Sequence, residues 1–246
     1  MDEKVAFVTG ADRGLGLALC GGLLEKGYRV FAGQYMPDWP DLAQLISRFP
    51  DRLTAVQLDV SSRDSAQEAA IFVAQQVPAV DVLINNAGIL TRSNTRSIRE
   101  EQSYSDMHTD FDINALGPLR VIEAFLPLME KSSIRRLCVV SSEAGSIAAS
   151  TRKAWFGYCM SKAAVNMAMK NLFNELRPQG YTFRLYHPGW MRTYMSGKKN
   201  MEATFEPDEA AVFALSYFLS GIEPGSEPPD EDRLVLRDYQ GKEYPW

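Results

Sequence analysis

The sequence predicts an α/β fold, a single domain over residues 1–246 in which a doubly wound parallel sheet forms the middle of three layers. Two observations indicate this fold. Short apolar runs alternate with longer segments of helical periodicity along the chain. The runs are apolar at nearly every position, which is typical of strands buried on both faces of a parallel sheet. A length of 246 residues suits one such domain, and no repeat, low-complexity tract or linker divides it.

Six apolar runs are predicted to be the main strands, at residues 5–9, 29–32, 53–58, 80–84, 137–141 and 183–186. A last short strand is predicted at 234–236, after a surface loop rich in Pro, Gly and acidic residues. Helical patterns lie between these runs, at about 15–26, 38–48, 62–77, 100–130, 155–177 and 207–220. Because strands and helices alternate, we expect right-handed crossovers between parallel strands.

Composition and charge exclude several classes of protein. Hydrophobic residues make up 46% and charged residues 23% of the chain, which is enough for a sizeable core. The net charge is −5 and no basic run occurs, so we expect no nucleic-acid partner. No apolar stretch approaches membrane-spanning length, and the run at 5–8 is too short for a signal peptide. We therefore expect a cytoplasmic protein without membrane association.

The cysteine and histidine residues give no sign of a disulfide framework or a metal site. Cys20, Cys138 and Cys159 are far apart in the sequence, which suits a reducing compartment. His108 and His187 lack the spacing of metal ligands, so no metal is expected. For Cys159, a reactive thiol at a helix N-terminus is one interpretation, and a small packed side chain is the favoured one.

A glycine-rich turn directly follows the first predicted strand and opens the first helix. It reads Thr9-Gly10-Ala11-Asp12-Arg13-Gly14-Leu15-Gly16. Glycine permits the tight turn and lets a pyrophosphate approach the backbone and the helix N-terminus. The alternative is a plain strand-to-helix turn. Its place in the first strand–helix unit favours dinucleotide binding, and with it a Rossmann fold.

The end of the second predicted strand bears on the choice between NAD and NADP. An acidic residue there normally binds the free 2′-hydroxyl of the adenosine ribose in NAD. This chain has Gly33-Gln34-Tyr35 at that point, and no carboxylate until Asp38. Arg13, just before Gly14, is placed to reach a 2′-phosphate, although a solvated surface arginine is the alternative. We therefore predict that NADP(H) is preferred over NAD(H).

Tyr158 and Lys162 are four residues apart at the start of a helical pattern. This spacing puts the phenol and the ammonium on one face, one turn apart. A free Tyr hydroxyl has a pKa near ~10. A fixed ammonium beside it favours the phenolate, so we expect Lys162 to lower the pKa of Tyr158. The pair then exchanges a proton with a bound oxygen near neutral pH, unless it is simply solvated.

Polar motifs follow the other predicted strands and lie in one helical pattern. They are Asp59-Val60, Asn85-Asn86-Ala87-Gly88, Ser141-Ser142-Glu143-Ala144-Gly145 and Pro188-Gly189-Trp190-Met191-Arg192-Thr193. Asn114 lies inside a helical pattern, where Asn has poor propensity. Each motif taken alone is also consistent with ordinary turn chemistry.

In this order, the motifs resemble those of the short-chain dehydrogenase/reductase family in its compact single-domain form, from Val5 to about Thr193. The resemblance implies an NADP(H)-dependent oxidoreductase, of carbonyl reductase or alcohol dehydrogenase type, that transfers hydride between nicotinamide and a carbonyl or alcohol. It also implies a homodimer or homotetramer. One alternative is an NADP-binding sensor that has lost catalysis, although such relatives usually lack the Tyr or the Lys. Another is an epimerase or dehydratase of the same fold, but these relatives are typically longer.

The resemblance also implies the roles of individual residues. Tyr158 looks like the general acid/base, and Ser142 like the hydroxyl that holds the substrate oxygen, since it stands three before Gly145. Lys162 resembles the residue that binds the nicotinamide ribose, and Asn114 the one that supports a water leading to that lysine. The implied cofactor contacts are Gly10, Asp12, Arg13, Gly14, Leu15, Gly16, Asp59, Val60, Asn86, Ala87, Gly88, Tyr158, Lys162, Pro188, Gly189, Met191 and Thr193.

Two segments are expected to shape the substrate site. Residues 190–206 stand where such enzymes carry a mobile lid, and the lid's apolar side chains either line a pocket or pack onto the core. They are Trp190, Tyr194, Met195, Met201 and Phe205. Ser142 and Tyr158 are sixteen residues apart, more than in the family pattern, so the segment between them is expected to reshape the pocket. A small carbonyl or alcohol of hydrophobic or aromatic character is the preferred substrate.

Overall fold

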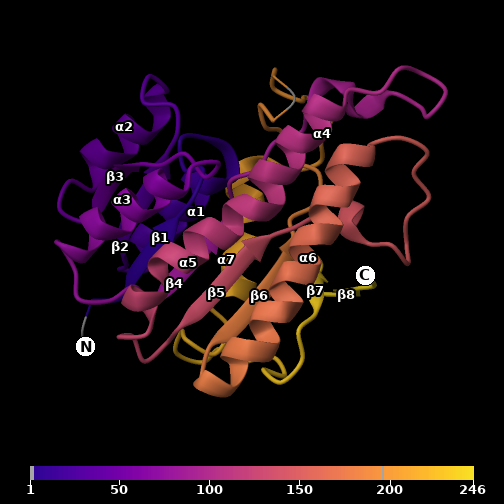
Figure 1. Cartoon of the computed structure of the whole chain (residues 1–246). Coiled ribbons are helices and arrows are strands. Elements are labelled where there is room, and N and C mark those ends of the chain that lie inside the picture. Colours follow the sequence, from indigo (N-terminus) through magenta and orange to yellow (C-terminus); the bar gives the residue numbers. More distant parts are fainter. Residues whose placement is uncertain (1–2, 196) are drawn as a thin grey trace.

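The centre of the molecule is an eight-stranded sheet in the order β3-β2-β1-β4-β5-β6-β7-β8. A computed structural model describes residues 3–195 and 197–246 (Figure 1). The strands are β1 (Val5–Val8), β2 (Arg29–Gln34), β3 (Leu53–Gln57), β4 (Val82–Asn85), β5 (Arg136–Val140), β6 (Thr182–His187), β7 (Leu236–Asp238) and β8 (Glu243–Tyr244). The pairs from β3 to β7 are parallel, and β8 runs antiparallel to β7.

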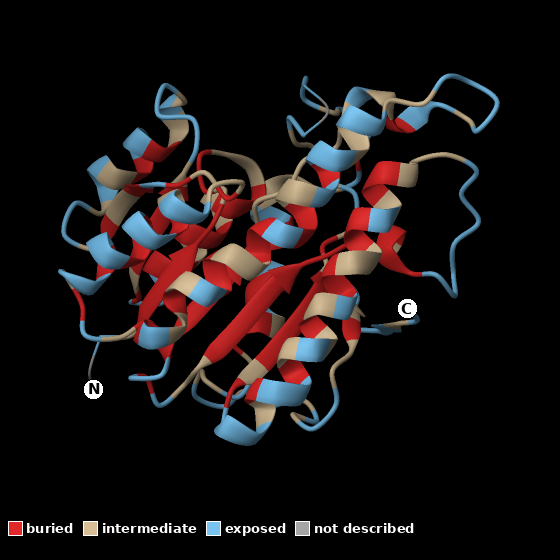
Figure 2. Cartoon of the chain, in the orientation of Figure 1, coloured by how far each residue is buried: buried red, intermediate tan, exposed pale blue. Residues whose placement is uncertain are grey.

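Helices cover both faces of the sheet, which makes three layers. The helices are α1 (Gly14–Glu25), α2 (Pro40–Arg48), α3 (Arg63–Ala74), α4 (Tyr104–Phe111), α5 (Gly117–Met129), α6 (Phe156–Leu176) and α7 (Pro207–Phe218). One hydrophobic cluster joins the sheet to α3, α5 and α6, and a second joins it to α1, α2 and α7. The strands between these layers are mostly buried (Figure 2), which confirms the predicted doubly wound α/β fold.

The segment 100–130 is not the single helix that its pattern predicts. The Ser103 side chain accepts a hydrogen bond from Asp106 N–H and starts α4. A π-helical turn, η2 (Asp112–Leu116), then separates α4 from α5. Gly117 N–H bonds to the carbonyl of Asp112, five residues back. The next residue, Pro118, has no N–H to continue an α-helical ladder, which explains the break.

The C-terminal edge of the sheet also differs from the prediction. The last parallel strand begins at Leu236, not at residue 234, and the antiparallel strand β8 was not predicted. The chain before it is held in a turn because Arg184 Nη2 pairs with Glu231 Oε1 at 2.6 Å. Leu236 is then the first residue to pair in register, opposite Leu185. None of the helices within 3–195 and 197–246 is long and apolar enough to cross a membrane.

Candidate active site

The predicted site residues meet at the carboxyl ends of β1, β4, β5 and β6. The strand order reverses between β1 and β4, and loops that follow these strands open a crevice at such a point. The start of α6 reaches the same edge, since a Cβ built on Gly145 would lie 2.7 Å from the backbone of Lys162. The fold thus brings the glycine turn, the residues after β4 and β5, and Tyr158 to one edge of the sheet.

The glycine turn is held against the end of β4. Gly10 and Gly14 have φ of +62° and +59°, in the left-handed region that favours glycine. The Asn86 side chain donates to the carbonyls of Thr9 and Gly10 at 3.0 and 3.1 Å. A Cβ on Gly10 would stand 2.9 Å from Cα of Ala87, so a larger residue does not fit there. Asn86 and Ala87 therefore fix the shape of the turn.

The turn fits the pyrophosphate of a dinucleotide. Helix α1 begins at Gly14 without an acidic residue in its first turn, and no side chain of the described part of the chain caps it. Its first N–H groups therefore lack side-chain partners, and the helix dipole favours an anion at this end. The side chain of Leu15 is buried in the core, so only its backbone belongs to the turn.

Arg13 lies against aromatic side chains that the sequence did not link to it. Its guanidinium carbon is 4.2 Å from the ring centre of Trp39 and 5.9 Å from that of Tyr194. The Asp12 carboxylate accepts the N–H of Met36 at 2.8 Å and ties the loop after β2 to the glycine turn. Arg13 makes no salt bridge within residues 3–195 and 197–246, so its charge is available for a phosphate.

Three more of the predicted cofactor residues lie after β3 and β6. The Asp59 carboxylate accepts from Ser61 N–H at 2.9 Å and Oγ–H at 2.6 Å. Val60 packs against α5, since a Cβ on Gly117 would stand 3.1 Å from it. Thr193 lies over the turn, 3.5 Å from a Cβ built on Gly14.

Three further predicted contacts lie in the segment after β6. Pro188 is buried, Gly189 has φ of +80°, and Met191 forms an isolated bridge with Phe205. Met191 packs against the hydrophobic cluster under α7, so its side chain points into the core.

Four buried polar residues form the centre of the site. Ser142 and Tyr158 are each 8% exposed, Lys162 is 3% exposed and Asn114 is 1% exposed. The Lys162 ammonium lies 5.7 Å from the ring centre of Tyr158 and donates to the carbonyl of Val140 at 3.1 Å. The predicted helical face therefore exists, and it is enclosed by protein rather than solvated.

Burial shifts the pKa values of the central pair in opposite directions and moves them apart. Burial raises the pKa of Tyr158 to about 12, the Ser142 hydroxyl acts to lower it, and the Glu143 carboxylate raises it. Burial lowers the pKa of Lys162 to about 8. The expectation that Lys162 lowers the pKa of Tyr158 is wrong for the protein alone, because loss of hydration disfavours the phenolate. Tyr158 is thus a neutral phenol at neutral pH and is able to donate a proton.

The two serines after β5 point in different directions. Ser141 Oγ donates to Asn166 Oδ1 at 2.6 Å inside the protein. Ser142 Oγ accepts from Ala144 N–H at 3.1 Å and acts on the Tyr158 phenol. The long segment between Ser142 and Tyr158 leaves the two hydroxyls together, so Ser142 is the one that can share an oxygen ligand with Tyr158.

Asn114 lies in the π-helical turn, a feature that often marks functional sites. Its side chain accepts from Ile89 N–H at 2.8 Å and donates to Ile89 O at 3.0 Å and Ser161 Oγ at 3.1 Å. A Cβ on Gly88 would lie 3.1 Å from Asn114 Oδ1 and 3.6 Å from Lys162 Nζ. Asn114 and Lys162 therefore flank Gly88 from two helices, with no direct hydrogen bond between them.

The rim of the site carries an ion pair that the sequence did not predict. Arg152 pairs with Glu143 and lies 4.5 Å from the ring centre of Trp155, which in turn meets Tyr158 edge-on at 5.9 Å. Burial raises the pKa of the Cys159 thiol, which favours the packed interpretation of that residue.

The apolar side chains of the segment 190–206 divide into two groups. Phe205 packs against Tyr239 and Phe213, at ring-centre distances of 4.9 and 5.8 Å. Trp190, Tyr194, Met195 and Met201 are between 38% and 64% exposed. One of these side chains therefore packs onto the core, and the others are open to a ligand.

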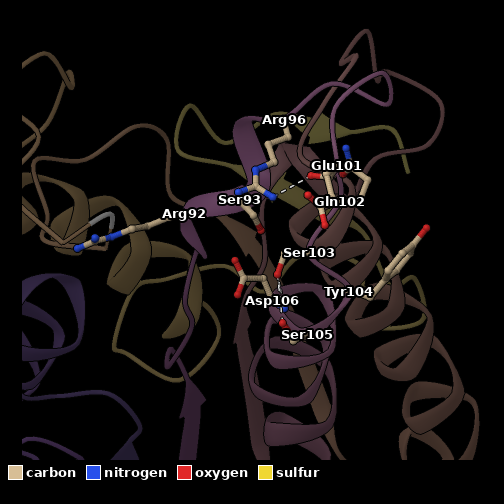
Figure 3. A pocket seen from close by; sticks show the side chains of 9 residues that line it. All are labelled: Arg92, Ser93, Arg96, Glu101, Gln102, Ser103, Tyr104, Ser105 and Asp106. Carbon is tan, nitrogen blue, oxygen red and sulfur yellow. Dashed lines mark hydrogen bonds between the residues drawn. The ribbon is translucent and has the colours of Figure 1, made fainter.

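An open pocket of about 540 Å³ lies between the short helix η1 (Arg92–Thr95) and the start of α4 (Figure 3). Its lining is polar and includes Arg96, Ser103 and Asp106, and none of the predicted site residues belongs to it. The buried titratable groups Tyr158 and Lys162 lie instead at the sheet edge. The described residues contain no group of three or more His, Cys, Asp or Glu side chains that could hold a metal ion.

Comparisons with known proteins agree with this geometry. A family model described as short chain dehydrogenase matches residues 4–204. The C-signal protein of Myxococcus xanthus is 42% identical over 167 residues, which are 68% of this chain and 93% of the relative. An uncharacterized oxidoreductase of Schizosaccharomyces pombe is 37% identical over 216 residues, 87% of this chain and 83% of the relative. The structure of NADPH-bound carbonyl reductase from chicken fatty liver has a TM-score of 0.84 at 29% identity, with 100% of both chains covered.

Proposed function

Since the chain belongs to the short-chain dehydrogenase family, we propose that it is an oxidoreductase that uses NADP(H) to interconvert a carbonyl compound and an alcohol, with Tyr158 as general acid/base. One observation carries this proposal: Tyr158, Ser142 and Lys162 are buried together beside a glycine turn that fits a pyrophosphate. Buried titratable groups with shifted pKa values in a crevice are typical of active sites.

The protein's own residues supply a proton and hold the substrate oxygen. Bound NADPH would supply the hydride, and the chain provides position and electrostatics around it. Tyr158 donates its phenolic proton to the carbonyl oxygen, and Ser142 hydrogen-bonds the same oxygen as it gains negative charge. The positive charge of Lys162 stabilises the phenolate that remains on Tyr158. Asn114 fixes the loop at Ile89, and we propose that it also supports a water that returns a proton through Lys162.

NADP(H) is the proposed cofactor because a negative charge is missing at one position and a positive charge is present at another. The end of β2 has no carboxylate to bind a free 2′-hydroxyl. The Arg13 guanidinium, which has no salt bridge within residues 3–195 and 197–246, donates to Met36 Sδ at 3.3 Å and so stands beside the loop after β2. The similarity to a carbonyl reductase that was crystallised with NADPH supports the same choice.

The proposed substrate is a small hydrophobic or aromatic carbonyl compound or alcohol. Support comes from the exposed Trp190, Tyr194 and Met201 of the proposed lid, residues 190–206, and from Trp155 beside Tyr158. Self-association into a homodimer or homotetramer is part of the proposal through the family, and so is a cytoplasmic location, which the three free cysteines suit.

A second candidate function is an NADP-binding sensor without turnover. The observation that favours it is the 42% identity to the protein named C-signal. A relative that has lost catalysis is expected to lose its proton donor, whereas this chain has both Tyr158 and Lys162. We therefore prefer the enzyme.

A spectrophotometric assay separates the two candidates. Purified protein is mixed with NADPH and a panel of aldehydes, ketones and quinones, and the loss of nicotinamide absorbance is followed. The enzyme predicts oxidation of NADPH with at least one class of carbonyl compound. Tight NADPH binding without oxidation by any member of the panel would instead support the sensor.

A further inference from the structure

The first turn of α6, which carries Tyr158, is not capped by any residue of its own. Its N-cap residue Trp155 makes no side-chain hydrogen bond to the helix and has φ of +68°, an uncommon conformation for a residue other than glycine. Helix starts normally satisfy their free N–H groups with a side chain at the N-cap position. The position of this helix must therefore be fixed from elsewhere in the fold.

Asn94 provides the missing cap from another segment. Its side-chain Oδ1 accepts the N–H of Tyr158 at 2.9 Å, and its backbone carbonyl accepts the N–H of Trp155 at 2.7 Å. Asn94 belongs to η1, in the loop after β4, more than sixty residues before Tyr158. Tyr158 is thus bonded through its own backbone to the loop after β4.

Asp110 fixes which way the Asn94 amide points. Asp110 is 0% exposed and lies at the end of α4. Its Oδ2 accepts from Asn94 Nδ2 at 2.7 Å and from the Thr91 hydroxyl at 2.9 Å, and its Oδ1 accepts Thr91 N–H at 3.1 Å. Because the carboxylate only accepts, the NH₂ of Asn94 must face it, and the amide oxygen is left for Tyr158.

The packing around this carboxylate leaves no room for a side chain at Gly157. A Cβ on Gly157 would stand 2.7 Å from Asp110 Oδ2 and 3.1 Å from Cα of Met107. Helices α4 and α6 therefore touch at Gly157, one residue before Tyr158. No salt bridge to Asp110 is found in the part of the chain that the structure describes, so its hydrogen bonds to Thr91 and Asn94 are what hold it.

We propose that Asn94 and Asp110 are positioning residues for Tyr158: the Asp110 carboxylate orients the Asn94 amide, and that amide caps the helix that carries the proton donor. The effect on catalysis rests on the proposed function, whereas the capping of α6 by Asn94 does not depend on that function. The loop after β4 thus has a role in holding the general acid against the substrate oxygen.

An exchange of the two side chains tests the inference. Asn94→Asp sets two carboxylates against each other. Asp110→Asn replaces one acceptor oxygen by an NH₂ group, so the donors of Thr91 and Asn94 are no longer all satisfied. We expect each to lower kcat about 10-fold or more, since small displacements of a reacting group have effects of this size. In the double variant, the NH₂ introduced by Asp110→Asn donates to the carboxylate introduced by Asn94→Asp, whose other oxygen still accepts from Tyr158 N–H. Among the backbone groups bonded to these two side chains, only the Thr91 carbonyl, which accepts from Asn94 Nδ2 at 3.1 Å, loses its donor. The double variant is therefore expected to have a higher kcat than either single variant.

Two readouts distinguish positioning from a general loss of structure. The dissociation constant for NADPH, measured by fluorescence, should stay within about twofold, because the glycine turn is formed by other elements. Hydrogen exchange of the Tyr158 amide should speed up in each single variant and slow again in the double one. Ser62→Ala is the matched control, since Ser62 caps α3 through Ser65 N–H at 3.2 Å, and it should leave kcat and the Tyr158 amide unchanged.

The outcomes separate this inference from the proposed function. If the wild type reduces no carbonyl compound but amide exchange follows the pattern above, the proposed function fails and the capping stands. If the wild type is active and the losses of the single variants simply multiply in the double one, the inference is overturned. Should a single variant not fold, Thr91→Val replaces it. This change removes the hydroxyl that donates to Asp110 Oδ2 and accepts from Asn94 Nδ2, and it should lower kcat by several-fold. An unchanged kcat and amide exchange in folded Thr91→Val would also overturn the inference.

Discussion

The ammonium of Lys162 lies 5.7 Å from the ring centre of Tyr158, one helical turn away, and both side chains are buried. Burial leaves the phenol neutral, with a pKa of about 12, and brings the ammonium to a pKa of about 8. Burial is the largest cause of both shifts, since loss of hydration disfavours whichever form is charged. Tyr158 is therefore fully protonated at neutral pH, and Lys162 beside it titrates just above neutral pH.

The first prediction concerns the pH dependence of carbonyl reduction. Lys162 stabilises the developing phenolate only while it is charged, and the pKa of Lys162 is about 8. We expect kcat/KM for the carbonyl substrate, at saturating NADPH, to be level below that pH and to fall as the pH rises through about 8. Initial rates in a constant-ionic-strength buffer series measure this profile. A profile that stays level to pH 10 would remove Lys162 charge from the mechanism.

The second prediction concerns stability. The pKa of Lys162 is lower in the folded protein than its ordinary value of 10.5, so its charge opposes folding below about pH 8. Lys162→Met should therefore raise the free energy of unfolding at pH 7 by about 1–3 kcal/mol. The gain is reduced by the free energy of the hydrogen bond from Lys162 to the Val140 carbonyl, which the variant lacks. Between pH 8 and 10.5 the wild type gains stability as it loses this charge, so the difference should narrow. Urea unfolding at pH 7 and pH 10 measures both values, and a less stable variant at pH 7 would contradict the prediction.

The third prediction concerns the choice of cofactor. Arg13→Ala should lower the ratio of NADPH to NADH turnover by about 10–100-fold, the usual effect of losing a charge-assisted hydrogen bond. Trp39→Ala removes the ring 4.2 Å from that guanidinium and should lower the ratio about 2–5-fold. The ratio is taken from kcat/KM values for the two nucleotides. Arg48→Ala is the control, because it removes an exposed positive charge from α2 without touching the turn. An unchanged ratio in Arg13→Ala would exclude Arg13 from cofactor selection.

The fourth prediction concerns the contact between α4 and α6. Gly157→Ala would put a Cβ 2.7 Å from Asp110 Oδ2, so we expect a displaced α6, a lower melting temperature and a kcat at least about 10-fold lower. Gly21→Ala is the matched control, since nothing lies within 4 Å of its Cβ in α1. It should raise stability by up to about 1 kcal/mol and leave kcat unchanged. Thermal melts and initial rates of both variants measure these effects, and equal behaviour would contradict the close contact.

The sequence predicted the layers of the fold because burial on both faces leaves a local signal. The runs that became β1, β4 and β5 are buried at every position, and each was visible as an apolar segment. The two-residue strand β8 has an exposed and a half-buried residue, so it leaves no such signal. The break after Asn114 had a visible cause in Pro118, but the helical pattern on both sides of it masked the effect.

The candidate site was predictable where its residues lie in short motifs, and not where they meet through the fold. Tyr158 and Lys162 share a helical face that spacing alone defines. Asp110 stands one helical turn before Asn114 in the sequence. This spacing was the only local sign that the segment has a buried polar face. The cap from Asn94 to Tyr158 N–H and the stack of Trp39 on Arg13 join distant segments, so no local pattern contains them.

The most direct test of the central claim is a single-turnover measurement with Tyr158→Phe. Enzyme saturated with NADPH is mixed with a carbonyl compound that the wild type reduces, and the decay of nicotinamide absorbance gives the rate of the chemical step. If Tyr158 is the proton donor, the rate should fall by about 10²–10⁴-fold. The dissociation constant for NADPH should change little, because the phenyl ring keeps its edge contact with Trp155. A rate within a few-fold of the wild type would show that another group donates the proton.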